Sequence, residues 1–263
     1  MSALDTLLLQ VAKTPDNGFT AYIAPDWMQG RTAYGGMSAA IALHVARLAH
    51  PTDKPLRSAQ ISFVGPVGGD CTVQTKLVRE SKSSQFVIAD VSAETGLGTH
   101  ALFTFSNPRV SHLDHDRMAM PDVPPPEVLE PIPEHPMRPV FTRHFDMRPS
   151  TGPQLLMGQD EADLLTWVRF AQEPACDPFV ALLALGDALP PAALKLMRQF
   201  GPVSSMNWTL QMLCDTPSTD DGWWLLRSTT HYARNGFSAQ EMTIWNRAGR
   251  AIATGGQGVA LYV

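Results

Sequence analysis

The sequence predicts an α+β protein in which one structural unit occurs twice, each unit being a curved antiparallel sheet wrapped around a central helix. Three observations support this prediction. Two segments are apolar on most helical faces, which is typical of buried helices. Each is followed by four segments in which apolar and polar residues alternate, as they do in strands. A proline-rich stretch separates the first set of segments from the second.

The two buried helices are predicted from their apolar residues and their end signals. The first covers residues 36–49, GMSAAIALHVARLA, and ends before Pro51. The second covers residues 178–189, PFVALLALGDAL. Asp177 is expected to cap the second helix, because an aspartate side chain accepts hydrogen bonds from the free N–H groups of the first turn. Pro178 suits the first helical position, where no N–H is needed.

Four strands are expected after each helix, and the turns before the last strand of each set match. These turns are AETG, which ends at Gly96, and NRAG, which ends at Gly249, and both are hairpin signals. One further strand is expected before each helix, near residues 18–24 and 141–147. The strands after the helices are predicted at residues 57–65, 71–81, 84–94, 99–106, 203–213, 223–232, 239–246 and 253–263.

The segment between Asn107 and Val140 holds nine of the 22 prolines and shows no apolar periodicity, so it is expected to be a linker. The predicted organisation is an N-terminal unit over residues 1–107, a linker over 108–139 and a C-terminal unit over 140–263. A strongly curved sheet must bury its inner face, and an apolar helix is a suitable filling. Two such units describe a double hot-dog fold, with two antiparallel curved sheets.

Length and composition exclude several classes of protein. The chain has 263 residues, of which 44% are hydrophobic and 17% charged, which is typical of a globular protein. Its net charge is −5 and it has no run of basic residues, so nucleic acid is not an expected partner. No apolar run approaches the roughly 20 residues that span a bilayer. The widely spaced cysteines and the absence of a secretion signal predict a cytoplasmic protein.

Asp187 is the only charged residue of the second predicted helix and is therefore a candidate catalytic group. A carboxylate that is buried without a partner is costly, and burial raises its pKa. The alternative is that Asp187, three residues before Pro190, lies at a frayed helix end in contact with solvent. The helix dipole mildly opposes this alternative, because a negative charge at a helix C-terminus is unfavourable.

Two polar residues of the later strands are further candidates. Gln257 lies between glycines in TGGQGVALYV, which indicates close approach by a ligand or another backbone, or a bulge that only bends the strand. Regular alternation over residues 203–213 places Ser205 on a polar face. That face either holds a water or substrate or is the solvent side of the sheet. Its other members are Asn207, Thr209 and Gln211.

No metal, cofactor or covalent serine nucleophile is expected. His112 and His115 in HLDHD have no third ligand nearby at a characteristic metal-site spacing, and no G-x-S-x-G elbow occurs. The stretch GRTAYGGM contains two glycines, Gly30 and Gly35, at the G-x-x-x-x-G spacing of a phosphate-binding loop. Gly36 and Met37 stand where such a loop has lysine and a hydroxyl residue, so phosphate binding of that kind is not expected.

Two short motifs in the first half carry a resemblance to a known family. Tyr34, Gly35 and Gly36 form an aromatic-Gly-Gly sequence at the start of the first helix, and Phe63 and Pro66 form an F-x-x-P pattern at the end of the next strand. With these motifs and its duplicated pattern, nearly the whole chain resembles the acyl-CoA thioesterase II family and its relatives. Those proteins are double hot-dog enzymes that hydrolyse fatty acyl-CoA, so the resemblance implies a role in fatty acid metabolism.

The resemblance also implies a catalytic set. The family has an aspartate in the second central helix, a threonine on the following strand and a glutamine on the last strand. Asp187 and Gln257 match the first and the last of these. Ser205, with Ser204 one step away, stands in place of the threonine. A serine keeps the hydroxyl but rotates more freely than a threonine, so a water would be held less firmly.

The resemblance implies a mechanism in which Asp187 accepts a proton from a water that Ser205 and Gln257 orient. The water then attacks the thioester carbonyl directly, without a covalent intermediate. Tyr34, Gly35 and Gly36 are expected to bind the substrate, because backbone N–H groups at a helix N-terminus can meet a carbonyl oxygen. The alternative for these glycines is that they serve only a tight entry into the helix.

Two other functions are compared with the thioesterase function. A non-catalytic acyl or acyl-CoA binding protein of this fold is the main alternative to a thioesterase. A hydratase of the hot-dog superfamily is disfavoured, because such enzymes pair an aspartate with a histidine a few residues on, and Arg31 stands five residues after Asp26. The resemblance also implies a homo-oligomer.

Overall fold

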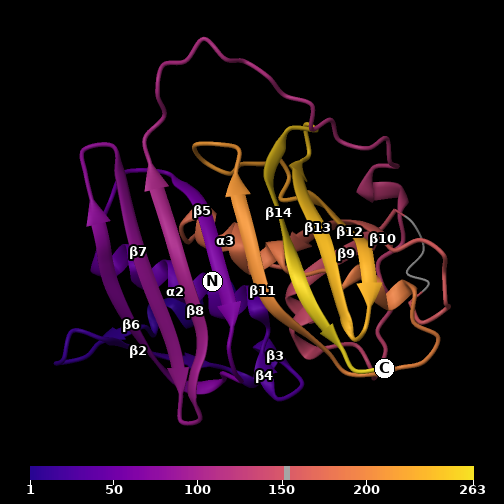
Figure 1. Ribbon diagram of the computed structural model, residues 1–263, viewed down its shortest axis with the longest axis horizontal. Helices are drawn as coiled ribbons and strands as arrows, with labels where there is room; N and C mark the ends of the chain where they lie inside the picture. Colours follow the sequence, from indigo (N-terminus) through magenta and orange to yellow (C-terminus); the bar gives the residue numbers. More distant parts are fainter. Residues whose placement is uncertain (151–154) are drawn as a thin grey trace.

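The computed structural model describes residues 1–150 and 155–263, in which a continuous antiparallel sheet packs over two central helices (Figure 1). The central helices are α2 (Gly35–Ala49) and α3 (Pro178–Gly186). The sheet has 12 strands in the order β1-β2-β6-β7-β8-β5-β11-β14-β13-β12-β10-β9. Among the described residues, none of the helices is long and apolar enough to cross a bilayer.

The remaining elements fall into an N-terminal set and a later set. Those of the N-terminal half are α1 (Ala3–Leu9), β1 (Ala12–Lys13), β2 (Phe19–Ile23), η1 (Pro25–Trp27), β3 (Met28–Gln29), β4 (Thr32–Ala33), β5 (Leu56–Phe63), β6 (Gly69–Glu80), β7 (Ser84–Ala93) and β8 (Gly96–Ser106). Those of the later part are η2 (Pro126–Val128), η3 (Val140–His144), β9 (Phe145–Pro149), β10 (Asp163–Phe170), η4 (Ala192–Lys195), β11 (Val203–Met212), β12 (Trp224–Arg234), β13 (Phe237–Asn246) and β14 (Ala251–Leu261).

Most of the predicted elements are confirmed. The strands predicted after each helix correspond to β5–β8 and β11–β14, and the first predicted helix corresponds to α2. Both hairpin turns are confirmed too, since Gly96 and Gly249 have φ angles of 111° and 84°. These left-handed conformations favour glycine because it has no Cβ.

The strand predicted near residues 141–147 is only partly right. Its first half is the 3₁₀ helix η3, and its second half begins β9, at the edge of the sheet. The place that β2 occupies in the first half belongs in the second half to β10, because β10 pairs with β12 as β2 pairs with β6. The sequence analysis missed β10. Its segment DLLTWVRF is buried on both faces, so it lacks the alternation of a half-exposed strand.

The two sheets predicted for the two halves are joined into one. Strand β5 of the first half pairs with β11 of the second, and Ile61 lies opposite Trp208. Both side chains are buried, with 2% and 0% of their surfaces exposed. The core therefore runs without a break across both halves of the chain.

The two central helices contact each other and run antiparallel. At one end, Arg47 near the C-terminus of α2 forms a 3.0 Å ion pair with Asp177, the N-cap of α3. At the other end, the first glycine of α2, Gly35, lies against Asp187 at the C-terminus of α3. The predicted capping of α3 is confirmed, because the Asp177 carboxylate accepts hydrogen bonds from the backbone N–H groups of Phe179 and Val180.

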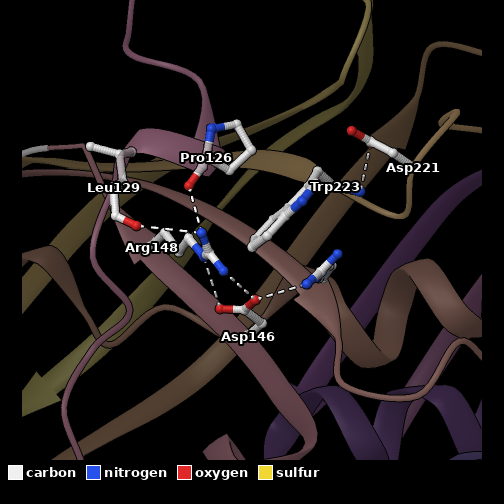
Figure 2. Close-up of polar contacts among 7 residues, drawn as sticks. Pro126, Leu129, Asp146, Arg148, Asp221 and Trp223 are labelled. Carbon is white, nitrogen blue, oxygen red and sulfur yellow. Dashed lines mark hydrogen bonds and ion pairs between the residues drawn. The ribbon is translucent and has the colours of Figure 1, made fainter.

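The proline-rich segment lies against the outer face of the C-terminal half. Arg148 of β9 donates to the carbonyl oxygen of Pro126 at 2.8 Å and to that of Leu129, and it also binds Asp146 (Figure 2). Elsewhere on this face, buried tryptophan side chains donate to the segment: Trp167 to Pro124 O at 3.0 Å and Trp245 to Met118 O at 2.7 Å. These contacts explain why β10 is buried on its outer face as well.

Candidate active site

The candidate site lies where the C-terminus of α3 meets the N-terminus of α2. Helix α3 ends at Gly186, so Asp187 is its C-cap residue rather than part of its interior as predicted. Prolines at positions 190 and 191 prevent the helix from continuing. The carboxylate is unfavourable at the C-terminus of its own helix, but it faces the positive end of α2. The antiparallel packing therefore supplies a favourable field for the charge.

Gly35 permits this close approach. A Cβ atom at this position would lie 2.6 Å from Asp187 Oδ2 and 2.9 Å from Cζ of Phe63. Both distances are shorter than real Cβ contacts, so only glycine leaves room for the carboxylate here. At Gly36 a Cβ would instead lie 2.7 Å from the ring and hydroxyl of Tyr34. A side chain at Gly35 would thus collide with the carboxylate, and one at Gly36 with the tyrosine.

A bulge in β11 brings Ser205 into the site. The register of β11 against β14 shifts between Ser205 and Asn207, which leaves Met206 as an extra residue in the strand. Regular alternation, on which the sequence prediction relied, would place Ser205 on the same face as Asn207, which is exposed. The bulge instead turns Ser205 to the inner face, which it shares with Trp208, while Ser204 remains exposed. Bulges commonly re-aim a side chain in this way next to functional sites.

Gln257 connects Ser205 with Asp187. The Ser205 hydroxyl donates a hydrogen bond to Gln257 Oε1 at 3.1 Å, and Gln257 Nε2 donates to Asp187 Oδ1 at 2.5 Å. The amide side chain is 5% exposed. All three predicted catalytic residues therefore lie in one hydrogen-bonded group, although they come from a helix end and two strands.

The glycines beside Gln257 allow close approach by neighbouring backbone. A Cβ at Gly255 would lie 1.8 Å from the carbonyl oxygen of Thr209 on β11, and one at Gly256 would lie 2.5 Å from that of Gln240 on β13. Of the possibilities that the sequence left open, the structure therefore shows close backbone approach at both glycines. The three strands are held tightly together at the level of the site.

Burial raises the pKa of Asp187 to about 7, while the hydrogen bond from Gln257 and the backbone N–H of Gly36 offset part of this rise. The residue keeps partial contact with solvent, as do Gly35 and Ser205. A carboxyl with a pKa near 7 is a stronger base than an ordinary surface aspartate and is still ionised in part at neutral pH. This combination is what a general base requires.

Tyr34 lies behind the site rather than at its surface. Its side chain is 1% exposed and its ring stacks on Phe141 with centroids 4.0 Å apart. Its buried hydroxyl has no hydrogen-bond partner within residues 1–150 and 155–263. Burial, together with the charge of Asp187, raises the pKa of Tyr34 further above its usual value, so the hydroxyl stays protonated. Its contacts in this structure are with protein groups.

Gln240 is a member of the site that the sequence analysis missed. Its Nε2 donates to Gln257 Oε1 at 3.1 Å, and its own Oε1 accepts a hydrogen bond from the backbone N–H of Ala192 at 3.0 Å. The side chain is 5% exposed. A signal was present in the sequence, because alternation in β13 places Gln240 on the apolar inner face with Met242 and Ile244.

Two other regions lie outside the site. His112 and His115 are both exposed, and no group of three potential ligand side chains in the described part of the chain could hold a metal ion. A cavity of about 280 Å³ is lined by residues including Trp27, His144 and Phe170. None of the predicted site residues lines it, so the hydrogen-bonded group around Asp187 carries the argument for function.

Comparison with known proteins identifies the family. The acyl-CoA thioesterase N-terminal domain matches residues 23–106, and the acyl-CoA thioesterase C-terminal domain matches residues 121–261. Comparison with curated proteins gave no match.

Solved structures share the fold over the full chain. A conserved protein of unknown function with hot dog fold from Alicyclobacillus acidocaldarius has a TM-score of 0.86 at 21% identity, and the alignment covers 100% of this chain and 99% of that one. The acyl-CoA thioesterase II TesB2 from Mycobacterium marinum has a TM-score of 0.78 at 16% identity, covering 99% and 98%. These similarities confirm the predicted double hot-dog fold. The chain belongs to the acyl-CoA thioesterase family and is a thioester hydrolase.

Proposed function

We propose that this enzyme hydrolyses acyl-CoA to a free acid and CoA by direct attack of a water molecule, with Asp187 as the general base. The observation that carries the proposal is the chain of hydrogen bonds from Ser205 through Gln257 to a carboxyl whose pKa is about 7. General bases work best when their pKa lies near the operating pH. Partial exposure of Asp187 leaves the carboxyl accessible to a water and a substrate.

The hydrogen-bond directions assign a role to each group. Because Ser205 gives its own proton to Gln257, its oxygen has lone pairs left to accept a hydrogen bond from the attacking water. Asp187 accepts the other hydrogen of that water. With both hydrogens held, the oxygen lone pair of the water is directed at the thioester carbonyl. Gln257 donates to Asp187 and so holds the carboxylate in place.

The bond changes balance without a covalent intermediate. The water oxygen bonds to the carbonyl carbon while Asp187 takes the proton. The negative carbonyl oxygen is stabilised by backbone N–H groups at the start of α2, where a helix has donors without intrahelical partners. The carbon–sulfur bond then breaks, and the CoA thiolate receives the proton from Asp187. Gly35 is the first residue of α2 and is partly exposed, so it is the proposed carbonyl-binding position. The buried side chain of Tyr34 packs behind this position, against Gly36.

The test is release of free CoA thiol from a panel of acyl-CoAs that varies in chain length and includes aromatic acyl groups. Asp187→Asn is expected to lower kcat by about 10² to 10⁴, the usual contribution of a general base. A variant that retains the rate of the wild type would contradict the role of Asp187. Binding of acyl-CoA without turnover by the wild type would instead support the non-catalytic binding protein.

The proposal extends to cellular location and assembly. The three cysteines are free, and two of them are buried, which fits a reducing compartment such as the cytoplasm. A homo-oligomer and a role in fatty acid metabolism follow from the family resemblance. Light scattering of the purified protein tests the oligomer, with a mass well above 28.7 kDa expected.

A further inference from the structure

A chain of directed hydrogen bonds runs from the protein backbone to the catalytic carboxylate. It begins at the N–H of Ala192, which donates to Gln240 Oε1 at 3.0 Å. Gln240 Nε2 donates to Gln257 Oε1 at 3.1 Å, and Gln257 Nε2 donates to Asp187 Oδ1 at 2.5 Å. Each of these three hydrogen bonds joins a donor to an acceptor, and all the groups involved belong to the described part of the protein.

The N–H of Ala192 fixes the donor-to-acceptor direction of all three hydrogen bonds. A side-chain amide can rotate by half a turn and exchange its oxygen and nitrogen, but a backbone N–H can only donate. Because Ala192 donates, Gln240 must present its oxygen to Ala192 and its nitrogen to Gln257. Gln257 must then present its oxygen to Gln240, which leaves its nitrogen for Asp187. The backbone of one residue therefore determines which atom the carboxylate meets.

Burial makes the directing group hard to replace by water. Ala192 is 0% exposed, and Gln240 and Gln257 are each 5% exposed. The N–H of Ala192 is free to donate because Ala192 is the first residue of the short helix η4, where no intrahelical acceptor exists. Pro191 precedes it as N-cap and has no N–H of its own to compete.

We propose that Gln240 is a positioning residue that fixes the orientation of the Gln257 amide, so that Asp187 always meets an N–H donor and stays ready to accept a proton. This inference rests on the proposed function of Asp187 as the base. If the amide were reversed, Gln257 Oε1 would face Asp187, and two acceptors can share a hydrogen bond only when the carboxyl is protonated. Reversal would therefore hold the base in its inactive form.

The test is Gln240→Met, an unbranched substitution of similar length without hydrogen-bonding groups. Loss of the donor lets the Gln257 amide reverse, so the pKa of Asp187 is expected to rise by about one unit. The pH midpoint of kcat should rise by the same amount, with kcat about fivefold lower at pH 7 and recovered at pH 9. A purely structural role would lower kcat equally at all pH values, and an unchanged midpoint would overturn the proposal.

The matched control is Gln85→Met on β7 of the other half. Gln85 is also buried, with 2% of its surface exposed, and it lies outside the chain of hydrogen bonds. Its variant should keep the midpoint of the wild type. If Gln240→Met does not fold, Gln240→Leu removes the donor without adding a charge, and the same upward shift is expected.

A measurement without substrate separates this inference from the proposed function. Carbon-13 NMR titration of the Asp187 carboxyl, assigned with Asp187→Asn, reports its pKa directly in the wild type and in Gln240→Met. A raised pKa in the variant supports the positioning role even if no acyl-CoA is hydrolysed, in which case only the proposed function fails. Hydrolysis by the wild type together with an identical pKa in both proteins would reject the positioning role alone.

Discussion

The charge of Asp187 is disfavoured by burial and favoured by neighbouring hydrogen-bond donors. Its position at the C-terminus of α3 and its burial both disfavour the charge. The N-terminus of α2, the N–H of Gly36 and the amide of Gln257 favour it. The outcome is a pKa of about 7, between that of a surface carboxylate and that of an isolated buried one. A group balanced in this way responds to pH in the neutral range.

This balance predicts the pH dependence of activity. The proposed base, Asp187, must be ionised to act, so kcat should rise with pH through the pKa of about 7. Between pH 6 and pH 8 the ionised fraction, and with it kcat, increases about tenfold. Initial rates measured across this range at saturating acyl-CoA check the prediction. A flat profile over the same interval would show that another group limits the reaction.

The two adjacent serines of β11 offer a matched pair of variants. Ser205 hydrogen-bonds to Gln257, whereas Ser204 is exposed on the other face of the strand. Ser205→Ala removes the proposed acceptor for the water and should lower kcat about 10²-fold. Ser204→Ala should leave kcat unchanged, and Ser205→Thr, which keeps the hydroxyl, should retain activity. Equal losses from both alanine variants would argue against a specific role for Ser205. Steady-state kinetics of the three variants provide the measurement.

At the level of the elements, the first turn of α2 is shaped to admit a carboxylate. Gly35→Ala is a favourable change for a helix but would place a Cβ 2.6 Å from Asp187 Oδ2. Displacement of the base by about 1 Å is expected to lower kcat about 10²-fold while the protein remains folded. Kinetics combined with a thermal melting curve check both parts of this expectation.

Gly68→Ala is the control for the glycine prediction. A Cβ there would lie 2.6 Å from the terminal methyl of Met28, the flexible end of a side chain that can move aside. Activity close to that of the wild type is expected for this variant. Full activity in Gly35→Ala as well would mean that the carboxylate does not need its present position.

On the scale of the whole molecule, the antiparallel helices α2 and α3 meet end to end at two places, one at each end of the helix pair. Only one of these two places carries the candidate site. The pair formed by the N-terminus of α2 and the C-terminus of α3 holds Asp187. The opposite pair is closed by the 3.0 Å ion pair between Arg47 and Asp177. The Arg47 guanidinium also lies over the rings of Phe105 and Phe179, 5.3 Å and 5.4 Å from their centroids. The ion pair between Arg47 and Asp177 therefore helps to hold the N-terminal and C-terminal halves together.

The proline-rich segment contributes to stability at the same scale. Arg148, with its side chain 22% exposed, links this segment to β9 through the carbonyl oxygens of Pro126 and Leu129. Arg148→Ala should lower the free energy of unfolding by about 1–3 kcal/mol, because these acceptors lose a charged donor, while kcat stays unchanged. Urea denaturation measures the difference. Arg143→Ala is the control, since that side chain is 68% exposed and 3.9 Å from Glu134, and a change of about 0.5 kcal/mol or less is expected.

Local sequence patterns were sufficient to predict most of the architecture. The buried helices, the hairpin glycines and the strands after each helix follow from apolar periodicity and turn chemistry, which act over a few neighbouring residues. Strand β10 was missed because the proline-rich segment covers its outer face, and that cover comes from residues distant in the sequence. The pairing of β5 with β11, which makes one sheet of two, depends on the same kind of distant contact.

The sequence by itself determined which residue types were available for the chemistry: a lone carboxylate at the end of an apolar helix, an amide between glycines and a serine on a neighbouring strand. Only the tertiary structure decided how they meet. The bulge at Met206 turns Ser205 inward, the antiparallel helices set Asp187 against Gly35, and the backbone of Ala192 orients two glutamines. The physical reason is that a pKa and a hydrogen-bond direction depend on groups close in space, which local sequence patterns do not record.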